Sequence, residues 1–302
     1  MNSFELMQGY PIQYHEPLFS PPSEGRSVII QITLGCSWNK CSFCEMYTSK
    51  QFKARSEEAI FKDIDAFIPY ADQITKVFLA DGDPLVLSNN RLLPILDKIT
   101  ATFPKLRRIS TYASPSNLSR KSTEELTALK NAGLTLLYVG IESGDSDVLH
   151  AIQKGETYET TIEGLNKSKA VGMDSSVMII NGVGGKLLTE QNAIHSAEVL
   201  NATQPKFAST LVLTAHKGMP HYKDRYQGEF IELSNIELYQ EMLVFMNHLN
   251  LNETIFRSDH ASNKLVLKGI LGRDKEKFIT QIQHAIDDPN GDSIRDFNYV
   301  GY

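Results

Sequence analysis

Cysteine is scarce in this chain of 302 residues, and its distribution is uneven. There are three cysteines, and all of them lie between positions 36 and 44. An odd, tightly spaced set is a poor basis for a disulfide framework. The rest of the sequence offers no thiol as a nucleophile or as a ligand of a second metal centre. The three cysteines are therefore expected to act together, as ligands of one site.

Long hydrophobic runs are also missing. No window of about 20 apolar residues exists, so no membrane span and no membrane partner are expected. The first 14 residues are polar and aromatic, and they lack the basic-then-apolar pattern of a signal peptide. These absences predict a cytoplasmic location.

An excess of positive charge is absent as well. The chain carries 30 Lys and Arg against 36 Asp and Glu, which gives a net charge of −6. Long-range attraction to nucleic acid is therefore not expected. The apolar fraction of 41% is large enough for a sizeable core.

Apolar segments of strand length alternate with amphipathic helical segments through most of the chain. Strands separated by helices form parallel sheets through right-handed crossovers. Six such units, rather than eight, predict an α/β fold with a partial (β/α)6 TIM-like barrel. The predicted strands cover residues 28–33, 74–80, 106–112, 134–141, 173–180 and 207–214.

The two ends of the chain depart from this alternation. Residues 1–27 contain four prolines with aromatic residues between them, which predicts a short N-terminal arm packed on the barrel. The barrel is expected over residues 28–250. Residues 251–302 are predicted to form a small C-terminal extension that closes the barrel, extended at 254–257 and helical at 275–286.

Several helices carry clear start signals. Ser56 precedes two glutamates and predicts an N-cap. Ser122 with Glu125, and Ser234 with Glu237, have the spacing of capping boxes. Further helical segments are expected over 145–172 and 191–202.

The cysteines stand in a loop after the first predicted strand, at Cys36, Cys41 and Cys44. Ligand sites of parallel-sheet enzymes gather at the carboxyl ends of strands. Three thiolates can hold a cubane iron–sulfur cluster and leave one iron open, because a cubane needs four ligands. The open iron could chelate S-adenosylmethionine, and an electron passed to the sulfonium would yield a 5′-deoxyadenosyl radical. The same thiolates could instead bind zinc with a histidine or aspartate, or remain unliganded.

This segment resembles the signature of the radical S-adenosylmethionine (SAM) superfamily, in which an aromatic residue precedes the last of three cysteines. Phe43 stands in the aromatic position, and four residues rather than three separate Cys36 from Cys41. The resemblance covers roughly residues 27–214, and it is to the branch of the methylthiotransferases and oxygen-independent coproporphyrinogen oxidases. It implies a [4Fe–4S] cluster held by the three cysteines, and SAM as the second cofactor.

Acidic residues and a glycine follow the second predicted strand, at Asp81, Gly82 and Asp83. In the superfamily, a Gly-Gly-Glu-like turn at this place holds the amino group of the methionyl moiety. The resemblance implies that Gly82 allows close backbone approach and that Asp81 or Asp83 accepts from the ammonium group. A plain acidic turn is the alternative interpretation.

The ends of the fourth and fifth predicted strands carry further candidates for binding SAM. Glu142, followed by Ser143, resembles the ribose-binding strand of the same branch, and Glu142 is assigned to the ribose hydroxyls. Lys154 is a candidate for the methionyl carboxylate, with a solvated helix lysine as the alternative. Gly182 and Gly184 would let the backbone lie against the adenine.

A polar segment over residues 257–264 follows the barrel. A surface turn that caps a helix is one interpretation. The other is that the segment folds across the open side of the barrel and lines the cavity, with Asp259, His260 and Asn263 at the substrate. His260 could then serve as a proton donor, because its intrinsic pKa lies near neutrality, and His216 is a second catalytic candidate.

The sequence says less about the reaction that the protein catalyses than about its cofactors. Without a fourth cysteine, sulfur insertion from a second cluster is not expected, and the sequence shows neither a cobalamin domain nor a tRNA-binding β-barrel. Hydrogen abstraction from a small substrate is expected, with an electron donor such as flavodoxin or ferredoxin. The alternative is a non-enzymatic zinc or iron–sulfur module that recognises a partner or RNA. The enzyme is favoured because four motifs fall at strand ends on one face of the predicted barrel.

Overall fold

Residues 11–295 are described by the structure, which is a computed structural model. The first ten residues of the predicted arm and the last seven of the C-terminal extension lie outside this range. The chain divides into two compact units. The first contains residues up to 39, 46–138 and 167–174, and the second contains 40–45, 139–166 and the residues from 175 on.

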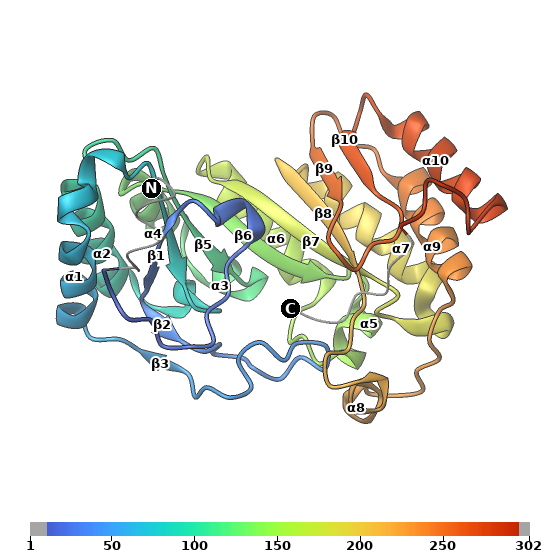
Figure 1. The fold of residues 1–302 in the computed structure, drawn as a ribbon, viewed down its shortest axis with the longest axis horizontal. Coiled ribbons are helices and arrows are strands. Elements are labelled where there is room, and N and C mark those ends of the chain that lie inside the picture. Colours follow the sequence, from blue (N-terminus) through green and yellow to red (C-terminus); the bar gives the residue numbers. More distant parts are fainter. Residues whose placement is uncertain (1–10, 296–302) are drawn as a thin grey trace. The chain divides into compact units, whose positions relative to one another are not determined.

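A parallel sheet forms the centre of the first unit. Its strands are, in order, β1 (Val28–Gln31), β4 (Lys76–Ala80), β5 (Arg108–Ala113) and the first half of β6 (Leu134–Glu142). Gln31 pairs with Ala80, so the carboxyl ends of β1 and β4 fall side by side. The helices are α1 (Glu57–Ala66), α2 (Asn89–Thr102), α3 (Pro115–Arg120) and α4 (Thr123–Asn131), with α1 and α2 packed together (Figure 1).

A second, very short pairing closes the loop that follows β1. β2 (Thr33–Leu34) is antiparallel to β3 (Lys53–Ala54), so the two ends of the loop between them lie side by side. Three 3-10 turns complete the unit: η1 (Pro22–Glu24), η2 (Ile68–Gln73) and η3 (Pro84–Val86).

The second unit has its own run of parallel strands. The second half of β6 is followed in order by β7 (Asp174–Asn181), β8 (Phe207–Val212) and β9 (Ile255–Ser258), and β10 (Leu267–Ile270) is antiparallel to β9. α9 packs against both α7 and α10 (Figure 1). The helices are α5 (Ser146–Ala151), α6 (Tyr158–Ala170, whose last turn belongs to the first unit), α7 (Gly185–Thr203), α8 (Met219–Arg225), α9 (Asn235–His248) and α10 (Lys275–Asp287).

The predicted local signals account for most of these elements. All six predicted strands are present, because apolar residues such as Ile30, Phe78 and Val177 lose all contact with water in the sheets. Both predicted capping boxes are formed, at the starts of α4 and α9, and Ser56 caps α1. The expected α/β class with a mostly parallel sheet is confirmed.

Three features of the secondary structure differ from the prediction. The helical segment expected over 145–172 is two helices, because Gln153 and Gly155 adopt left-handed backbone angles of 56° and 75° and interrupt it. The helix expected from residue 191 begins at Gly185. The extended segment at 254–257 is β9, a further parallel strand beside β8.

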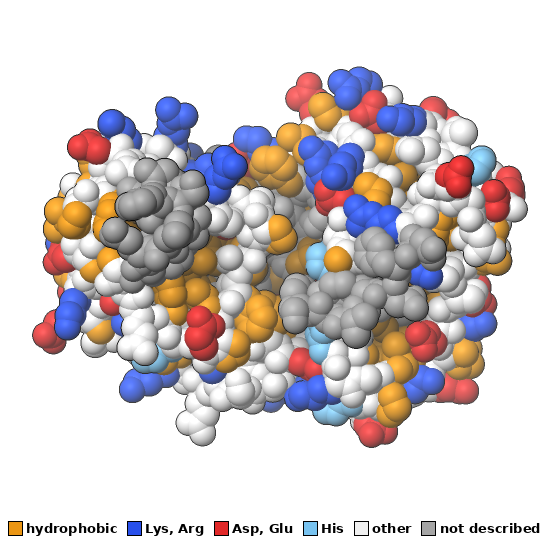
Figure 2. Space-filling model, in the orientation of Figure 1, with side chains coloured by type: hydrophobic (Ala, Val, Ile, Leu, Met, Phe, Trp, Pro, Cys, Tyr) orange, Lys and Arg blue, Asp and Glu red, His pale blue; other side chains and the backbone are white. Residues whose placement is uncertain are grey.

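Charged side chains of both signs lie on the face of the molecule shown in Figure 2. On the face drawn in Figure 2, acidic and basic side chains are interspersed on each unit. Between residues 11 and 295, no helix combines the length and the apolar character that crossing a bilayer requires.

Candidate active site

Cys36, Cys41 and Cys44 form no disulfide among the described residues, and each is partly exposed to solvent. Cys36 belongs to the first unit, whereas Cys41 and Cys44 belong to the second. Among the described residues, no three His, Cys, Asp or Glu side chains stand close enough together to hold a metal ion. Three cysteine thiols nevertheless have the donor chemistry that an iron–sulfur cluster takes.

One buried carboxylate holds both ends of the segment that carries these thiols, residues 35–50, named here the cysteine loop. Asp81 is fully buried, and its Oδ2 accepts from the Gly35 N–H at 2.9 Å and from Lys50 Nζ at 2.9 Å. Its Oδ1 accepts from Gln31 Nε2 at 2.8 Å. The first and last residues of the cysteine loop therefore meet at Asp81.

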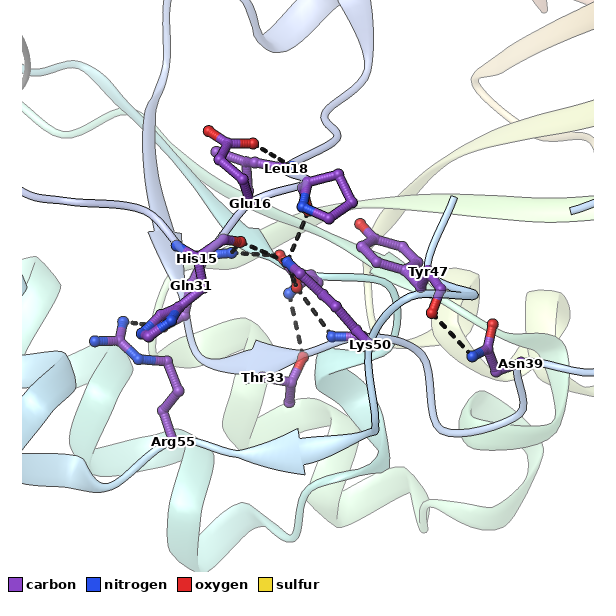
Figure 3. A network of polar contacts seen from close by, with 12 residues as sticks. His15, Glu16, Leu18, Gln31, Thr33, Asn39, Tyr47, Lys50 and Arg55 are labelled. Atoms are coloured by element: carbon purple, nitrogen blue, oxygen red, sulfur yellow. Dashed lines mark hydrogen bonds and ion pairs between the residues drawn. The ribbon is translucent and has the colours of Figure 1, made fainter. Parts of the chain in front are cut away.

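The N-terminal arm joins the same network. Lys50 Nζ also donates to the carbonyl oxygens of His15 and Pro17. His15 pairs with the Gln31 side chain through both its N–H, at 2.9 Å, and its carbonyl, at 3.0 Å. Figure 3 shows Lys50 extending toward His15 and Gln31. Gln31, Lys50 and His15 were not identified from the sequence, since no local pattern marks them.

Gly82 sits against the first cysteine. Its N–H donates to the Gly35 carbonyl at 3.1 Å. A Cβ at this position would lie 3.1 Å from the Cβ of Cys36 and 2.7 Å from the ring of Tyr47. A side chain at this position would displace the Tyr47 ring and crowd the side chain of Cys36.

Asp83 holds the other side of Cys36. Its carboxylate accepts from the hydroxyl of Ser37 and from the side-chain amide of Asn117, a residue of α3. The predicted acidic turn therefore contacts the residues on both sides of Cys36.

The interval between Cys36 and Cys41 contains a left-handed turn. Asn39 has φ of 48°, a conformation that asparagine tolerates better than most residues. Its Nδ2 donates to the Tyr47 carbonyl at 3.0 Å, so the turn is tied back to the cysteine loop.

Glu142 ends β6 in a strained conformation. Its φ is 64°, and its nearly buried carboxylate accepts from Lys154 Nζ at 3.1 Å. Burial alone would lower the pKa of Lys154, but the charges of Glu142, Cys41 and Glu156 outweigh it, so the pKa is raised and the ammonium stays charged. Lys154 also lies 5.8 Å from the ring centroid of Phe43. The structure thus brings Glu142, Lys154 and Phe43 together.

Ser143 is engaged within the fold. Its hydroxyl donates to Asn192 Oδ1 at 2.6 Å, and the next N–H, of Gly144, donates to Ser196 Oγ at 2.9 Å. Both acceptors lie on α7, so the end of β6 is fixed to that helix.

The buried carboxylate of Glu241 lies against residues 182–185, the glycine loop that follows β7. The Gly182 N–H donates to Glu241 Oε1 at 2.7 Å, and Thr189 donates to its Oε2 at 2.6 Å. Burial raises the pKa of Glu241. Gly182 has φ of 79°, and a Cβ there would lie 2.8 Å from Leu238. The carbonyl of Gly184 accepts from Tyr226.

Glu241 was not singled out from the sequence, although a signal exists. It falls three residues after Leu238 and four before Phe245, on the apolar face of the predicted helix. A carboxylate on such a face must find buried donors, and the donors here belong to the glycine loop and to α7.

The histidine candidates lie within reach of each other's charge. Burial lowers the pKa of His260, Asp259 opposes this effect, and His216 lowers it further. Asp259 pairs with Lys268 at 2.9 Å. The amide of Asn263 is buried and donates to a β8 carbonyl at 2.7 Å, so this side chain holds residues 258–267 against the sheet. Contact of these residues with a substrate stays a prediction.

The comparisons with known proteins identify the family. Residues 30–200 match the model of the Radical SAM superfamily, which is more than half of the chain. The chain therefore belongs to the radical SAM superfamily, whose members are enzymes that use a [4Fe–4S] cluster and SAM. The class expected from the cysteine segment is confirmed.

Individual relatives are distant. The heme chaperone HemW of Bacillus subtilis (strain 168) is 23% identical over 179 residues, which are 59% of this chain and 46% of that protein. The GTP 3′,8-cyclase of Listeria welshimeri is 25% identical over 168 residues, which are 53% of this chain and 47% of that protein. The chain thus spans about half the length of the curated relatives it matches.

Solved structures agree on the fold. Coproporphyrinogen III oxidase (HemN) from Escherichia coli has a TM-score of 0.57 at 16% identity, over 73% of this chain and 52% of that one. Methylornithine synthase (PylB) has a TM-score of 0.51 at 14% identity, over 85% of this chain and 68% of that one. At these identities the likeness concerns the arrangement of strands and helices.

Proposed function

We propose that Cys36, Cys41 and Cys44 hold one [4Fe–4S] cluster and that the chain uses SAM to abstract a hydrogen atom from a small substrate. The observation that supports this most is the cysteine loop, closed at Gly35 and Lys50 by the single carboxylate of Asp81. A loop fixed at both ends holds its thiols in a restricted volume before any cluster binds. When bound, the reduced cluster supplies the electron that splits SAM into methionine and a 5′-deoxyadenosyl radical.

The proposal divides the acidic turn between two roles. Asp81 is fully buried and accepts from three donors, so it is given the task of positioning the cysteine loop. Asp83, which accepts from Ser37 and Asn117, is the other carboxylate of the turn and is the candidate for the ammonium group of SAM. Gly82 keeps its own backbone close to Cys36.

The second unit supplies the other contacts in this proposal. Glu142 accepts from the ribose hydroxyls, and Lys154, kept charged by its neighbours, pairs with the methionyl carboxylate. Gly182 and Gly184 lie against the adenine, and Glu241 fixes the loop that contains them. A flavodoxin or ferredoxin is the proposed electron donor.

Anaerobic reconstitution tests the proposal. We expect about four irons and four sulfides per chain, and we expect Cys36→Ala, Cys41→Ala and Cys44→Ala each to lose the brown absorbance. Reduced wild-type protein should release 5′-deoxyadenosine and methionine from SAM, which chromatography detects. Zinc in place of iron, or a variant that keeps a complete cluster, would contradict the ligand assignment.

A further inference from the structure

A small cavity lies wholly within the second unit. It has a volume of about 70 Å³ and is lined by the last residues of β7, β8 and β9, by α9 and by residues 262–267. Ligands of parallel sheets bind at the carboxyl ends of strands. This cavity therefore stands where a parallel α/β protein places a binding site, and its lining includes Asn263.

Two side chains in its walls contain polar atoms with no hydrogen-bond partner. In the part of the chain that the structure describes, neither Asn181 Oδ1 nor the Tyr239 hydroxyl has one. These side chains are 3% and 7% exposed. A buried polar atom without a hydrogen bond destabilises the folded state by about 1–3 kcal/mol. A ligand that supplies the missing hydrogen bond would remove this destabilisation.

Several polar groups of the cavity are already engaged, which restricts the partners that a ligand can find there. The amide of Asn181 is hydrogen bonded to Glu241, which leaves its carbonyl oxygen as an acceptor. Ser262 Oγ accepts from a β8 N–H at 3.1 Å, and Asn263 donates to a β8 carbonyl. Burial raises the pKa of Tyr239, so its hydroxyl stays neutral and can donate.

We propose that this cavity receives a neutral amide or alcohol group of the substrate. Its N–H or O–H donates to Asn181 Oδ1, and its oxygen accepts from Tyr239. That the ligand is a substrate rests on the proposed function. A water molecule needs about 10–15 Å³ of such a cavity, so the volume suits a group of a few heavy atoms.

Charged groups fit less well. A carboxylate can pair with Lys264, which also lines the cavity, but it carries no donor for Asn181 Oδ1. An ammonium group meets no carboxylate, because none lines the cavity. The donor–acceptor pair thus selects a neutral group that both donates and accepts.

The experiment uses cluster-loaded protein and four small probes: acetamide, ethanol, acetate and methylammonium. Saturation-transfer NMR measures the binding of each probe. Acetamide and ethanol should bind, and Tyr239→Phe should weaken acetamide about three- to tenfold, the effect of one neutral hydrogen bond. Tyr70→Phe, a partly exposed tyrosine in η2, is the matched control and should change nothing.

Thermal unfolding gives a second readout that needs no activity. Because Tyr239→Phe removes an unpaired hydroxyl, it should raise the midpoint of the ligand-free protein. A lowered midpoint would mean that the hydroxyl serves the fold, and binding of acetate or methylammonium alone would mean that the cavity takes charged groups. Either result, or no binding at all, overturns the proposal. SAM cleavage by the wild type, measured in parallel, reports separately on the proposed function.

Discussion

Glu142 combines a left-handed backbone with a nearly buried carboxylate, and both features have a cost. A non-glycine residue in this region is strained, and such strain concentrates at functional sites. The ion pair with Lys154 explains the burial of the charge but not the backbone conformation. The role in cofactor binding proposed above is consistent with both features.

Glu142→Ala should therefore weaken SAM binding by about 1–3 kcal/mol, the effect of losing a hydrogen bond to a charged group. Titration calorimetry on cluster-loaded protein measures this. Glu159→Ala, an exposed glutamate on α6, is the control and should bind SAM as the wild type does. Unchanged affinity in Glu142→Ala would show that the carboxylate serves only to pair with Lys154.

The residue scale also shows what the sequence could not supply. The acidic turn and the cysteines are visible as motifs because their members are neighbours along the chain. The partners of Asp81 are not, since Gln31 lies 50 residues away and Lys50 lies 31 residues away. Nothing in the sequence distinguishes Gln31 and Lys50 from the other glutamines and lysines. Their contacts with Asp81 become visible only in the folded structure.

At the scale of elements, the hydrophobic pattern predicted the six strands, and capping signals predicted the starts of α1, α4 and α9. The single helix predicted over 145–172 was wrong, because Gln153 and Gly155 adopt left-handed backbone angles. A left-handed residue interrupts a helix without disturbing the apolar pattern of the sequence. β9 was predicted as extended but not as a member of the sheet. Its pairing with β8 depends on contacts between residues about 48 positions apart, such as Phe207 and Ile255.

The cysteine loop is the element with the sharpest prediction. Lys50→Met removes one partner of a buried ion pair and leaves the charge of Asp81 uncompensated, which should lower the free energy of unfolding by about 3–5 kcal/mol. We also expect faster loss of iron to a chelator, because the loop ends separate. Urea unfolding and the decay of cluster absorbance measure the two effects.

A matched control lies three residues further on. Lys53 is exposed in β3, and Lys53→Met should behave as the wild type in both assays. Lys50→Met combined with Asp81→Asn should recover part of the lost stability, since no unpaired charge then remains. Equal behaviour of Lys50→Met and Lys53→Met would contradict the positioning role.

At the scale of the whole molecule, ligand binding and folding are linked. SAM at a hundredfold excess over its dissociation constant should raise the free energy of unfolding by about 2.7 kcal/mol if it binds only the folded chain. Denaturant unfolding under anaerobic conditions measures this, and the single tryptophan, Trp38, reports on the cysteine loop. Protein with all three cysteines changed to alanine should show little of the effect. An equal rise in that variant would mean that SAM binds without the cluster.

The meeting of Gly35 and Lys50 at one carboxylate also makes the cysteine loop tolerant of changes in length. When the two ends of a loop are fixed, an added residue alters only the path between them, and doubling a loop costs only about 0.6 kcal/mol. The left-handed turn at Asn39 lies on this path, between Cys36 and Cys41. A residue inserted between Cys36 and Cys41 should therefore leave the contacts of Asp81 with Gly35 and Lys50 in place.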